Sequence, residues 1–193
     1  MNNLIATIHR DYLPKNVLQE NTILFLDVEK IDTFLTKVEF LPRDKVEKII
    51  DYKQIIPYIV IENEFNQIAT YKRKGNESRL HHLWSIGFGG HIEYTDVENN
   101  FCTETIKKAA IRELNEEFSN KVNYELIFKG IINEEITDVG KNHLGFVFKT
   151  RVKKNEYIPS KEIGNIDWIN LHNINLAEFE LWSQMAIKLI LKQ

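Results

Sequence analysis

Cysteine is nearly absent from this sequence, and its one occurrence, Cys102, cannot close an internal disulfide. A single thiol is also too few for a zinc site built from thiolates, so a structural metal of that kind is excluded. Cys102 is expected to be a buried or incidental thiol. Redox chemistry on cysteine is therefore not indicated.

Long apolar runs are missing as well. No stretch approaches the roughly 18 consecutive apolar residues that a membrane-spanning helix needs. The first residues, MNNLIATIHRDYL, lack the basic start and the apolar core of a secretion signal. These absences predict a cytoplasmic protein with no membrane partner.

An excess of positive charge is the third absence. The chain has 25 Lys and Arg against 28 Asp and Glu, a net charge of −3. The broad basic face that a long nucleic acid requires is therefore not expected. A small anionic substrate would need local help to bind, for example from a metal ion.

The 193 residues suffice for one domain with a substantial core and are too few for two enzyme domains. We expect an N-terminal extension over residues 1–53 that can pack on a main domain over residues 54–193. In the extension, residues 21–27 predict a strand and residues 43–51 a short helix. Composition leaves open whether the extension caps a pocket or mediates a homodimer.

The main domain alternates between strand and helix patterns. Two β-rich runs around a polar turn, residues 55–61 and 68–73, predict a hairpin. Further strands are predicted over 83–88, 124–137, 143–152 and 166–171, and helices over 103–118 and 177–193. This order predicts an α+β fold in which a mixed sheet lies between helices, an α/β/α sandwich.

The helix predicted over residues 103–118 concentrates negative charge near its end. Thr103 is expected to be its N-cap, and neither proline nor glycine interrupts it. One face is apolar, and the neighbouring arc carries Glu113, Glu116 and Glu117. Like charges at this spacing cost about 0.2–0.5 kcal/mol per pair, at the helix end where anions are disfavoured. Taken alone, the segment favours a solvated acidic face paired with lysines; a bound divalent cation is the alternative that would offset the repulsion.

The residues around these glutamates decide between the two alternatives. Glu104 is followed by the seven residues TIKKAAI and then by RELNEE from Arg112 to Glu117, and upstream lies the corner GGHIE from Gly89 to Glu93. The chain resembles the Nudix (MutT-like) hydrolases, whose signature is G, five residues, E, seven residues and R-E-U-x-E-E-x-G-U, where U is bulky and aliphatic. The resemblance covers about residue 55 to the C-terminus and implies the Nudix fold.

Two departures from the family pattern are visible. Thirteen residues separate Gly90 from Glu104 where the family has five, which predicts an inserted loop at residues 94–102. Loop insertions cost only about 0.6 kcal/mol per doubling of length, so the corner and the helix can still meet. Ser119 and Asn120 replace the glycine and the aliphatic residue after the glutamates. Asparagine tolerates the left-handed helix stop, and neither departure removes a carboxylate.

The resemblance implies a metal-dependent hydrolase that cleaves a diphosphate linkage in a nucleoside diphosphate derivative or a similar small molecule, by attack of water on phosphorus. Glu113, Glu116 and Glu117 are the implied ligands of Mg²⁺ or Mn²⁺, with the carbonyl of Gly89 as a further ligand. Glu116 and Glu117 are also implied in catalysis. Arg112 is expected to pair with Glu104 and to orient the helix against the corner.

A catalytic base and residues that hold the substrate are also expected. Some family members take the base from a loop before a late strand with a tryptophan, and Glu162 lies six residues before Trp168. Glu117 is the alternative base, and weaker options are Glu134, Glu135 and Asp138. The substrate is expected at Gly89 and Gly90, with Arg73 or Arg79 near a phosphate. Side chains to which we assign no chemistry, because core or surface roles are commoner, are His81, His82, His91, His143, Trp84, Phe88 and Tyr94.

The alternative to a hydrolase is a protein with the same fold that does not catalyse the reaction. The inserted loop and the altered helix stop are compatible with a non-catalytic or regulatory Nudix domain that binds a nucleotide without turnover. Isomerisation of a prenyl diphosphate, which some relatives of the fold perform, resembles a cysteine and glutamate context that this sequence lacks. The substrate and its leaving group depend on pocket loops, which a family resemblance does not specify.

Overall fold

The computed structural model describes residues 4–72, 83–118, 125–153 and 165–192 of the chain. In those ranges the elements follow one another in an order of strands and helices that is typical of an α+β protein. In chain order they are β1 (Leu4–His9), η1 (Arg10–Tyr12), β2 (Asn21–Leu24), α1 (Val28–Leu35), β3 (Glu39–Pro42), α2 (Arg43–Val46), β4 (Tyr52–Asn63), β5 (Gln67–Lys72), β6 (Trp84–Ser85), β7 (Gly87–Phe88), η3 (Tyr94–Asp96), α3 (Thr103–Glu117), β8 (Ile127–Glu134), α4 (Asp138–Asn142), β9 (His143–Val152), β10 (Asp167–Asn170), η5 (Leu171–Asn173), η6 (Leu176–Glu178) and α5 (Leu181–Leu191).

The strands in these ranges form one mixed sheet whose main path runs β10-β5-β4-β9-β8-β2. At its centre β4 and β9 run parallel, and the other pairings are antiparallel. The opposite edge of β4 is shared, because β1 pairs with residues 52–54 and β7 pairs with residues 59–60. Between these two partners the segment 89–93 runs from β7 to a bridge between Glu93 and Ile5. This segment is the glycine corner of the sequence.

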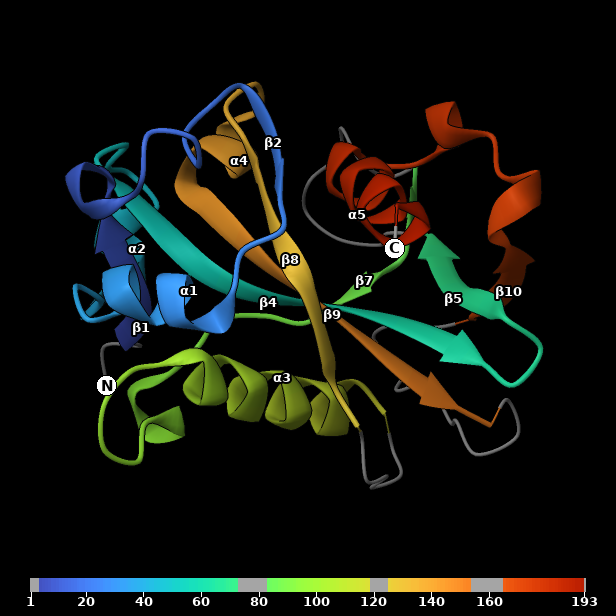
Figure 1. The fold of residues 1–193 in the computed structure, drawn as a ribbon, viewed down its shortest axis with the longest axis horizontal. Coiled ribbons are helices and arrows are strands. Elements are labelled where there is room, and N and C mark those ends of the chain that lie inside the picture. Colours follow the sequence, from blue (N-terminus) through green and yellow to red (C-terminus); the bar gives the residue numbers. More distant parts are fainter. Residues whose placement is uncertain (1–3, 73–82, 119–124, 154–164, 193) are drawn as a thin grey trace.

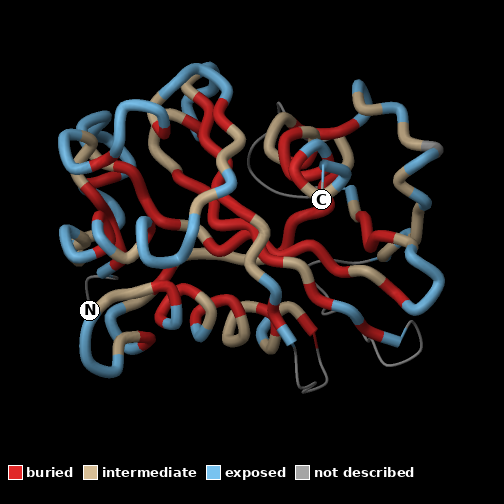
Figure 2. The backbone as a smooth tube through the Cα atoms, viewed as in Figure 1, coloured by how far each residue is buried: buried red, intermediate tan, exposed pale blue. Residues whose placement is uncertain are grey.

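Helices cover both faces of the sheet, as the sequence predicts (Figure 1). Alternate residues of β4 point to opposite faces because a strand has a period of two. Ile55, Ile59 and Ile61 join α1 and α3 in one core cluster, whereas Tyr58 and Val60 join α5 in the other. Figure 2 shows buried residues concentrated along β4 and on the side of α3 that faces the sheet. The two expected helices therefore lie on opposite sides of the sheet.

Residues 1–53 contribute more structure than the sequence indicates. The expected strand is β2, and the expected helix over 43–51 shrinks to the four residues of α2. The structure adds β1, α1 and β3, which the sequence analysis missed. β1 pairs with β3 and β4, and β2 pairs with β8, so this segment is part of the sheet. A domain boundary at residue 53 stays a prediction.

The ends of the two long helices differ from the expected ones. Cys102, in extended conformation, is the N-cap of α3 in place of Thr103, and the side chain of Asp32 accepts hydrogen bonds from the backbone N and Oγ1 of Thr103 at 2.9 and 2.7 Å. The C-terminal helix α5 begins at Leu181 rather than at residue 177. In the described ranges no helix is both long and apolar enough to span a membrane.

Candidate active site

The glycine corner is wedged between a strand and a helix. Gly89 has a φ of +141°, which residues with a side chain rarely adopt, and a Cβ on it would lie 2.0 Å from the carbonyl oxygen of Pro57 in β4. A Cβ on the next residue, Gly90, would lie 2.4 Å from Oε2 of Glu113 in α3. Gly89 requires glycine, whereas a side chain at Gly90 would displace the Glu113 carboxylate, so the corner brings the start of the family signature against its glutamate helix.

Arg112 connects the corner, the inserted segment and the glutamates. Its Nε and Nη2 donate to the two carboxylate oxygens of Asp96 at 3.0 and 2.9 Å. Nη2 also donates to the backbone oxygen of His91 at 2.8 Å. Nη1 donates to Glu113 at 2.8 Å and to Glu116 at 3.2 Å. The hydrogen bonds from Arg112 to Asp96 are the main cause of a raised Arg112 pKa, so the guanidinium stays charged.

The expected ion pair between Arg112 and Glu104 is wrong. Glu104 is exposed in the first turn of α3, and Arg112 follows it by eight helical steps, a rise of about 12 Å along the helix. Asp96 is the partner of Arg112, and it follows Gly90 by five intervening residues, the spacing that the family signature gives to its glutamate. The extra residues of this chain therefore lie after the acid of the signature, between Asp96 and α3. The spacing from Gly90 was the signal that could have identified Asp96.

This assignment predicts a difference in stability between two acidic residues. Asp96→Asn is expected to lower the free energy of unfolding by about 2 kcal/mol, because Asp96 is buried and its charge meets Arg112 in a bidentate pair. Glu104→Gln, the control, is expected to change it little. Urea denaturation of both variants measures the two values. Equal losses would contradict the pairing.

The three signature glutamates differ in their surroundings. Glu113 is mostly buried beside Gly90, and burial raises its pKa while the charge of Arg112 opposes that shift. The Glu116 side chain is 60% exposed. Because Glu113 and Glu116 accept hydrogen bonds from the same nitrogen of Arg112, their carboxylates lie close together. In the part of the chain that the structure describes, no three His, Cys, Asp or Glu side chains are grouped to hold a metal ion.

The donor chemistry at Glu113 and Glu116 still fits a hard divalent ion. Mg²⁺ takes oxygen ligands and is usually held by one or two carboxylates together with waters and substrate phosphates. Two neighbouring carboxylates on one helix face meet that requirement without a third protein ligand. The fit therefore rests on Glu113 and Glu116, with Glu117 one residue further along α3.

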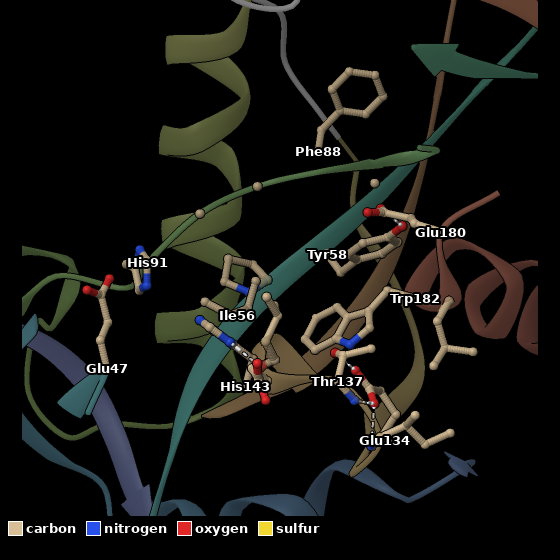
Figure 3. Close-up of a pocket in the computed structure, with 18 of the residues that line it drawn as sticks. Glu47, Ile56, Tyr58, Phe88, His91, Glu134, Thr137, His143, Glu180 and Trp182 are labelled. Carbon is tan, nitrogen blue, oxygen red and sulfur yellow. Dashed lines mark hydrogen bonds between the residues drawn. The ribbon is translucent and has the colours of Figure 1, made fainter. Parts of the chain in front are cut away.

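A cavity of about 900 Å³ lies on the other side of the glycine corner (Figure 3). Its walls come from β4, the corner, α2, the end of β8 with α4, the start of β9 and the start of α5. In Figure 3, Glu47 and His91 lie at one end, and Glu180 and Trp182 at the other. The lining residues are Arg43, Glu47, Ile56, Pro57, Tyr58, Tyr71, Gly87, Phe88, Gly89, Gly90, His91, Glu134, Ile136, Thr137, Asp138, Val139, His143, Glu180, Leu181 and Trp182.

Several of these residues were not expected from the sequence. His91 and His143, to which the sequence analysis assigned no chemistry, face one another in the cavity wall with ring centres 6.0 Å apart. Nε2 of His91 lies 2.8 Å from Oε1 of Gln54. Burial, followed by the charges of Arg43 and His143, lowers the pKa of His91 to about 4. His91 is therefore neutral at pH 7.

The neutral state of His91 predicts a dependence of stability on pH. Its pKa is about 4 in the folded protein and about 6.5 when unfolded. Between these values only the unfolded chain binds the proton, so stability is lost as pH falls from about 6.5 to 4, by up to about 3 kcal/mol. Urea denaturation at pH 7 and pH 4.5 measures the loss. His91→Gln is expected to reduce it, and an unchanged difference between the two pH values would contradict the assignment.

The other end of the cavity contains a buried carboxylate. Glu180, 6% exposed, accepts hydrogen bonds from Ser85 at 2.6 Å and Ser183 at 3.2 Å. Tyr58 and Ser183 share a hydrogen bond of 2.8 Å. Gly87 allows this arrangement, because a Cβ there would lie 1.9 Å from the Tyr58 ring. No local sequence signal identified this cluster.

Two weaker candidates for the base have structural partners. Glu134 accepts hydrogen bonds from the backbone N of Ile136 and Thr137 at 2.7 and 2.9 Å and from the Thr137 hydroxyl. Glu135 binds Lys53 at 2.7 Å and Arg10 at 2.8 Å. These contacts hold the turn before α4 in place. Asp138 lines the cavity.

Lys53 is fully buried beside Glu135. Its Nζ also donates to the backbone oxygen of Gly140 at 2.6 Å. Burial lowers the pKa of Lys53 to about 8. Burial opposes ionisation of Glu135 too, but the hydrogen bonds from Arg10 and Lys53 outweigh it and lower the pKa of that carboxyl. The cluster links the N-terminal segment, β4 and the turn before α4.

Some of the remaining residues predicted from the sequence are not described by the structure, and the others lie in different surroundings. Arg73, Arg79 and Glu162 lie outside the described residues, as do His81, His82, Ser119 and Asn120. Phe88 is buried and lines the cavity, Trp84 lies beneath the Lys72 ammonium group at 5.0 Å, and Tyr94 is exposed against Phe40. Tyr94 and Trp84 are absent from the cavity wall.

Known proteins share this sequence and fold to different extents. No protein-family model matches the chain. Protein YmaB of Bacillus subtilis is 28% identical over an alignment of 210 positions that spans 98% of each protein. The crystal structure of Tm1382, a candidate Nudix hydrolase, matches with a TM-score of 0.80 at 27% identity, over 98% of both chains. A MutT Nudix hydrolase from Burkholderia pseudomallei matches with a TM-score of 0.55 at 15% identity, over 72% of this chain and 98% of its own.

Proposed function

We propose that the chain is a metal-dependent hydrolase of a small molecule, because its fold and its signature residues resemble those of Nudix hydrolases, which act on phosphoanhydride bonds. The bond cleaved is a diphosphate linkage, in a nucleoside diphosphate derivative or a similar compound. Water attacks one phosphorus, the bridging P–O bond breaks, and the water gives up a proton.

The observation that carries this proposal is the position of Arg112. One guanidinium holds the acid of the signature, Asp96, the backbone of the corner at His91 and two signature glutamates, Glu113 and Glu116. The sequence signature is thus assembled as one connected unit beside a cavity. A solvated acidic face would not need this arrangement.

The residues of the candidate site have separate proposed roles. Mg²⁺ or Mn²⁺, held by Glu113, Glu116 and Glu117 with the carbonyl of Gly89, would neutralise the charge that develops on the diphosphate. Arg112 orients two of these carboxylates. Gly89 and Gly90 let the substrate approach the backbone, and Arg73 or Arg79 is proposed to contact a phosphate. Glu162 or Glu117 is proposed to accept the proton of the water.

A non-catalytic nucleotide-binding domain is the second candidate. The ion pairs of Arg112 favour it, because the guanidinium already neutralises part of the negative charge of Glu113 and Glu116 that would attract a metal ion. Such a domain would use the cavity and leave the diphosphate intact.

Product release separates the two candidates. Purified protein with Mg²⁺ or Mn²⁺ is incubated with a panel of nucleoside diphosphate derivatives, and products are separated by chromatography. The hydrolase is expected to release phosphate-containing products only when metal is present. Calorimetric binding of a panel compound with no product over hours supports the second candidate, and neither binding nor product overturns both.

A further inference from the structure

The N-terminal segment supplies one wall of the cavity. Arg43 and Glu47, from α2 and the residue that ends it, line the cavity together with the glycine corner. Among the described lining residues Arg43 is the only lysine or arginine, whereas four are acidic: Glu47, Glu134, Asp138 and Glu180. An anion in this cavity therefore depends on Arg43 for a favourable charge.

The guanidinium of Arg43 is only partly used by the protein. Its Nε donates to Oε1 of Glu47 at 2.7 Å, and its side chain is 48% exposed. Neither Nη1 nor Nη2 donates a hydrogen bond to a residue in the described ranges. A guanidinium whose two outer nitrogens make no hydrogen bond to the described protein keeps the paired donors that bind phosphoryl oxygens.

Contacts of the residues that follow Arg43 hold its turn in place. Val46 of the same helix is 1% exposed in the core. The backbone oxygen of Glu47 accepts a hydrogen bond from Asn142 at 3.3 Å, and that of Ile50 accepts one from Arg10 at 2.6 Å. The turn that carries Arg43 is thus tied to α4 and to η1. An ordered backbone reduces the entropy that binding would cost.

The charge of Arg43 also reaches the glycine corner. Arg43 binds Glu47, which lies with His91 at one end of the cavity (Figure 3), and His91 follows Gly90 in the chain. Among the described lysines and arginines, Arg43 alone lines the cavity, so it supplies the permanent positive charge at this end. Under the proposed function, the diphosphate lies at this same corner.

We propose that Arg43 binds a phosphoryl group of the substrate on the cavity side of Gly90, and that the N-terminal segment thereby determines which diphosphate compounds are accepted. The inference rests on the proposed function where it calls the bound compound a substrate. The binding of a phosphoryl group can be tested without turnover. Arg43 acts on affinity and is not required for the attack of water.

Inorganic pyrophosphate, without metal, is the probe for binding. Calorimetry is expected to show about tenfold weaker binding for Arg43→Gln than for the unsubstituted protein, and a smaller loss for Arg43→Lys, which keeps the charge but not the paired donors. Arg151→Gln is the matched control, because Arg151 is exposed on β9 and does not line the cavity. Thermal denaturation confirms that each variant is folded. Equal binding by Arg43→Gln, or no binding by the unsubstituted protein, overturns the inference.

Kinetics separate this inference from the proposed function. With a hydrolysed panel compound, Arg43→Gln is expected to raise KM about tenfold and to change kcat less than about threefold. Hydrolysis with an unchanged KM overturns the role of Arg43 and leaves the hydrolase intact. If no compound is hydrolysed while pyrophosphate binding still depends on Arg43, the hydrolase fails and the phosphoryl site stands.

Discussion

Glu116→Gln is expected to lower metal-dependent hydrolysis by about 100- to 1000-fold, the loss typical of removing one group that stabilises charge in a transition state. The glutamine amide keeps the shape but loses the negative charge that a divalent ion requires. Little stability should be lost, because the Glu116 side chain is 60% exposed and meets Arg112 at 3.2 Å. Steady-state rates with saturating Mg²⁺ or Mn²⁺ measure the effect.

Glu104→Gln is the matched control for that variant. It removes the same charge from the same helix, at an exposed position that does not contact Arg112. Its hydrolysis rate should stay within about twofold of the unsubstituted protein, as for surface substitutions away from the site. Calorimetric titration with Mn²⁺ adds a second readout, since Glu116→Gln alone should weaken uptake of the ion. Similar losses in both variants would contradict a specific role for Glu116.

Glu135→Ala is expected to lower the free energy of unfolding by about 3–5 kcal/mol. The change leaves Lys53, which is fully buried, and Arg10 without their shared carboxylate. Removing one partner of a buried pair exposes the desolvation cost of the other charge, which accounts for the size of the loss. Urea denaturation of the variant at pH 7 measures it. Glu98→Ala, which breaks an exposed pair with Lys108, should leave the midpoint unchanged.

A double variant tests whether the unpaired charge of Lys53 causes this loss of stability. Lys53→Met with Glu135→Leu removes the buried ammonium group together with its carboxylate and fills the space with apolar groups, which often restores stability. Arg10 also loses Glu135 in this variant, but it keeps its hydrogen bonds to the backbone oxygens of Ile50 and Lys141. The double variant is therefore expected to be more stable than Glu135→Ala. A double variant that is less stable would assign the loss to packing rather than to charge.

Much of the fold could be predicted from the main domain. The hairpin β4–β5, the strand β9 and the helix α3 follow from strong local periodicity, and the structure confirms all three. Residues 1–53 were harder, because β1 and β3 are short and owe their place to long-range pairing with each other and with β4. Pairing partners far apart in sequence leave little trace in local composition.

The residues of the candidate site also differ in how far the sequence predicts them. Gly89, Gly90 and the glutamates of α3 lie in the two parts of the signature on either side of the extra residues, so the sequence alone predicts them as candidates. Asp96 was missed because Glu104 also satisfies the spacing to Arg112, and only the fold shows which acid reaches the guanidinium. Arg43 and Trp182 come from segments far from the signature, and only the folded chain brings them to one cavity.

The two glycines of the corner have a mechanical consequence. Gly89 lies against the backbone of β4 and Gly90 lies against the Glu113 carboxylate, so two consecutive residues without side chains lie between the glutamate helix and the cavity. The contact between the corner and α3 is therefore made by the Glu113 carboxylate itself. A cation that binds Glu113 would act on the corner at Gly90, which also lines the cavity.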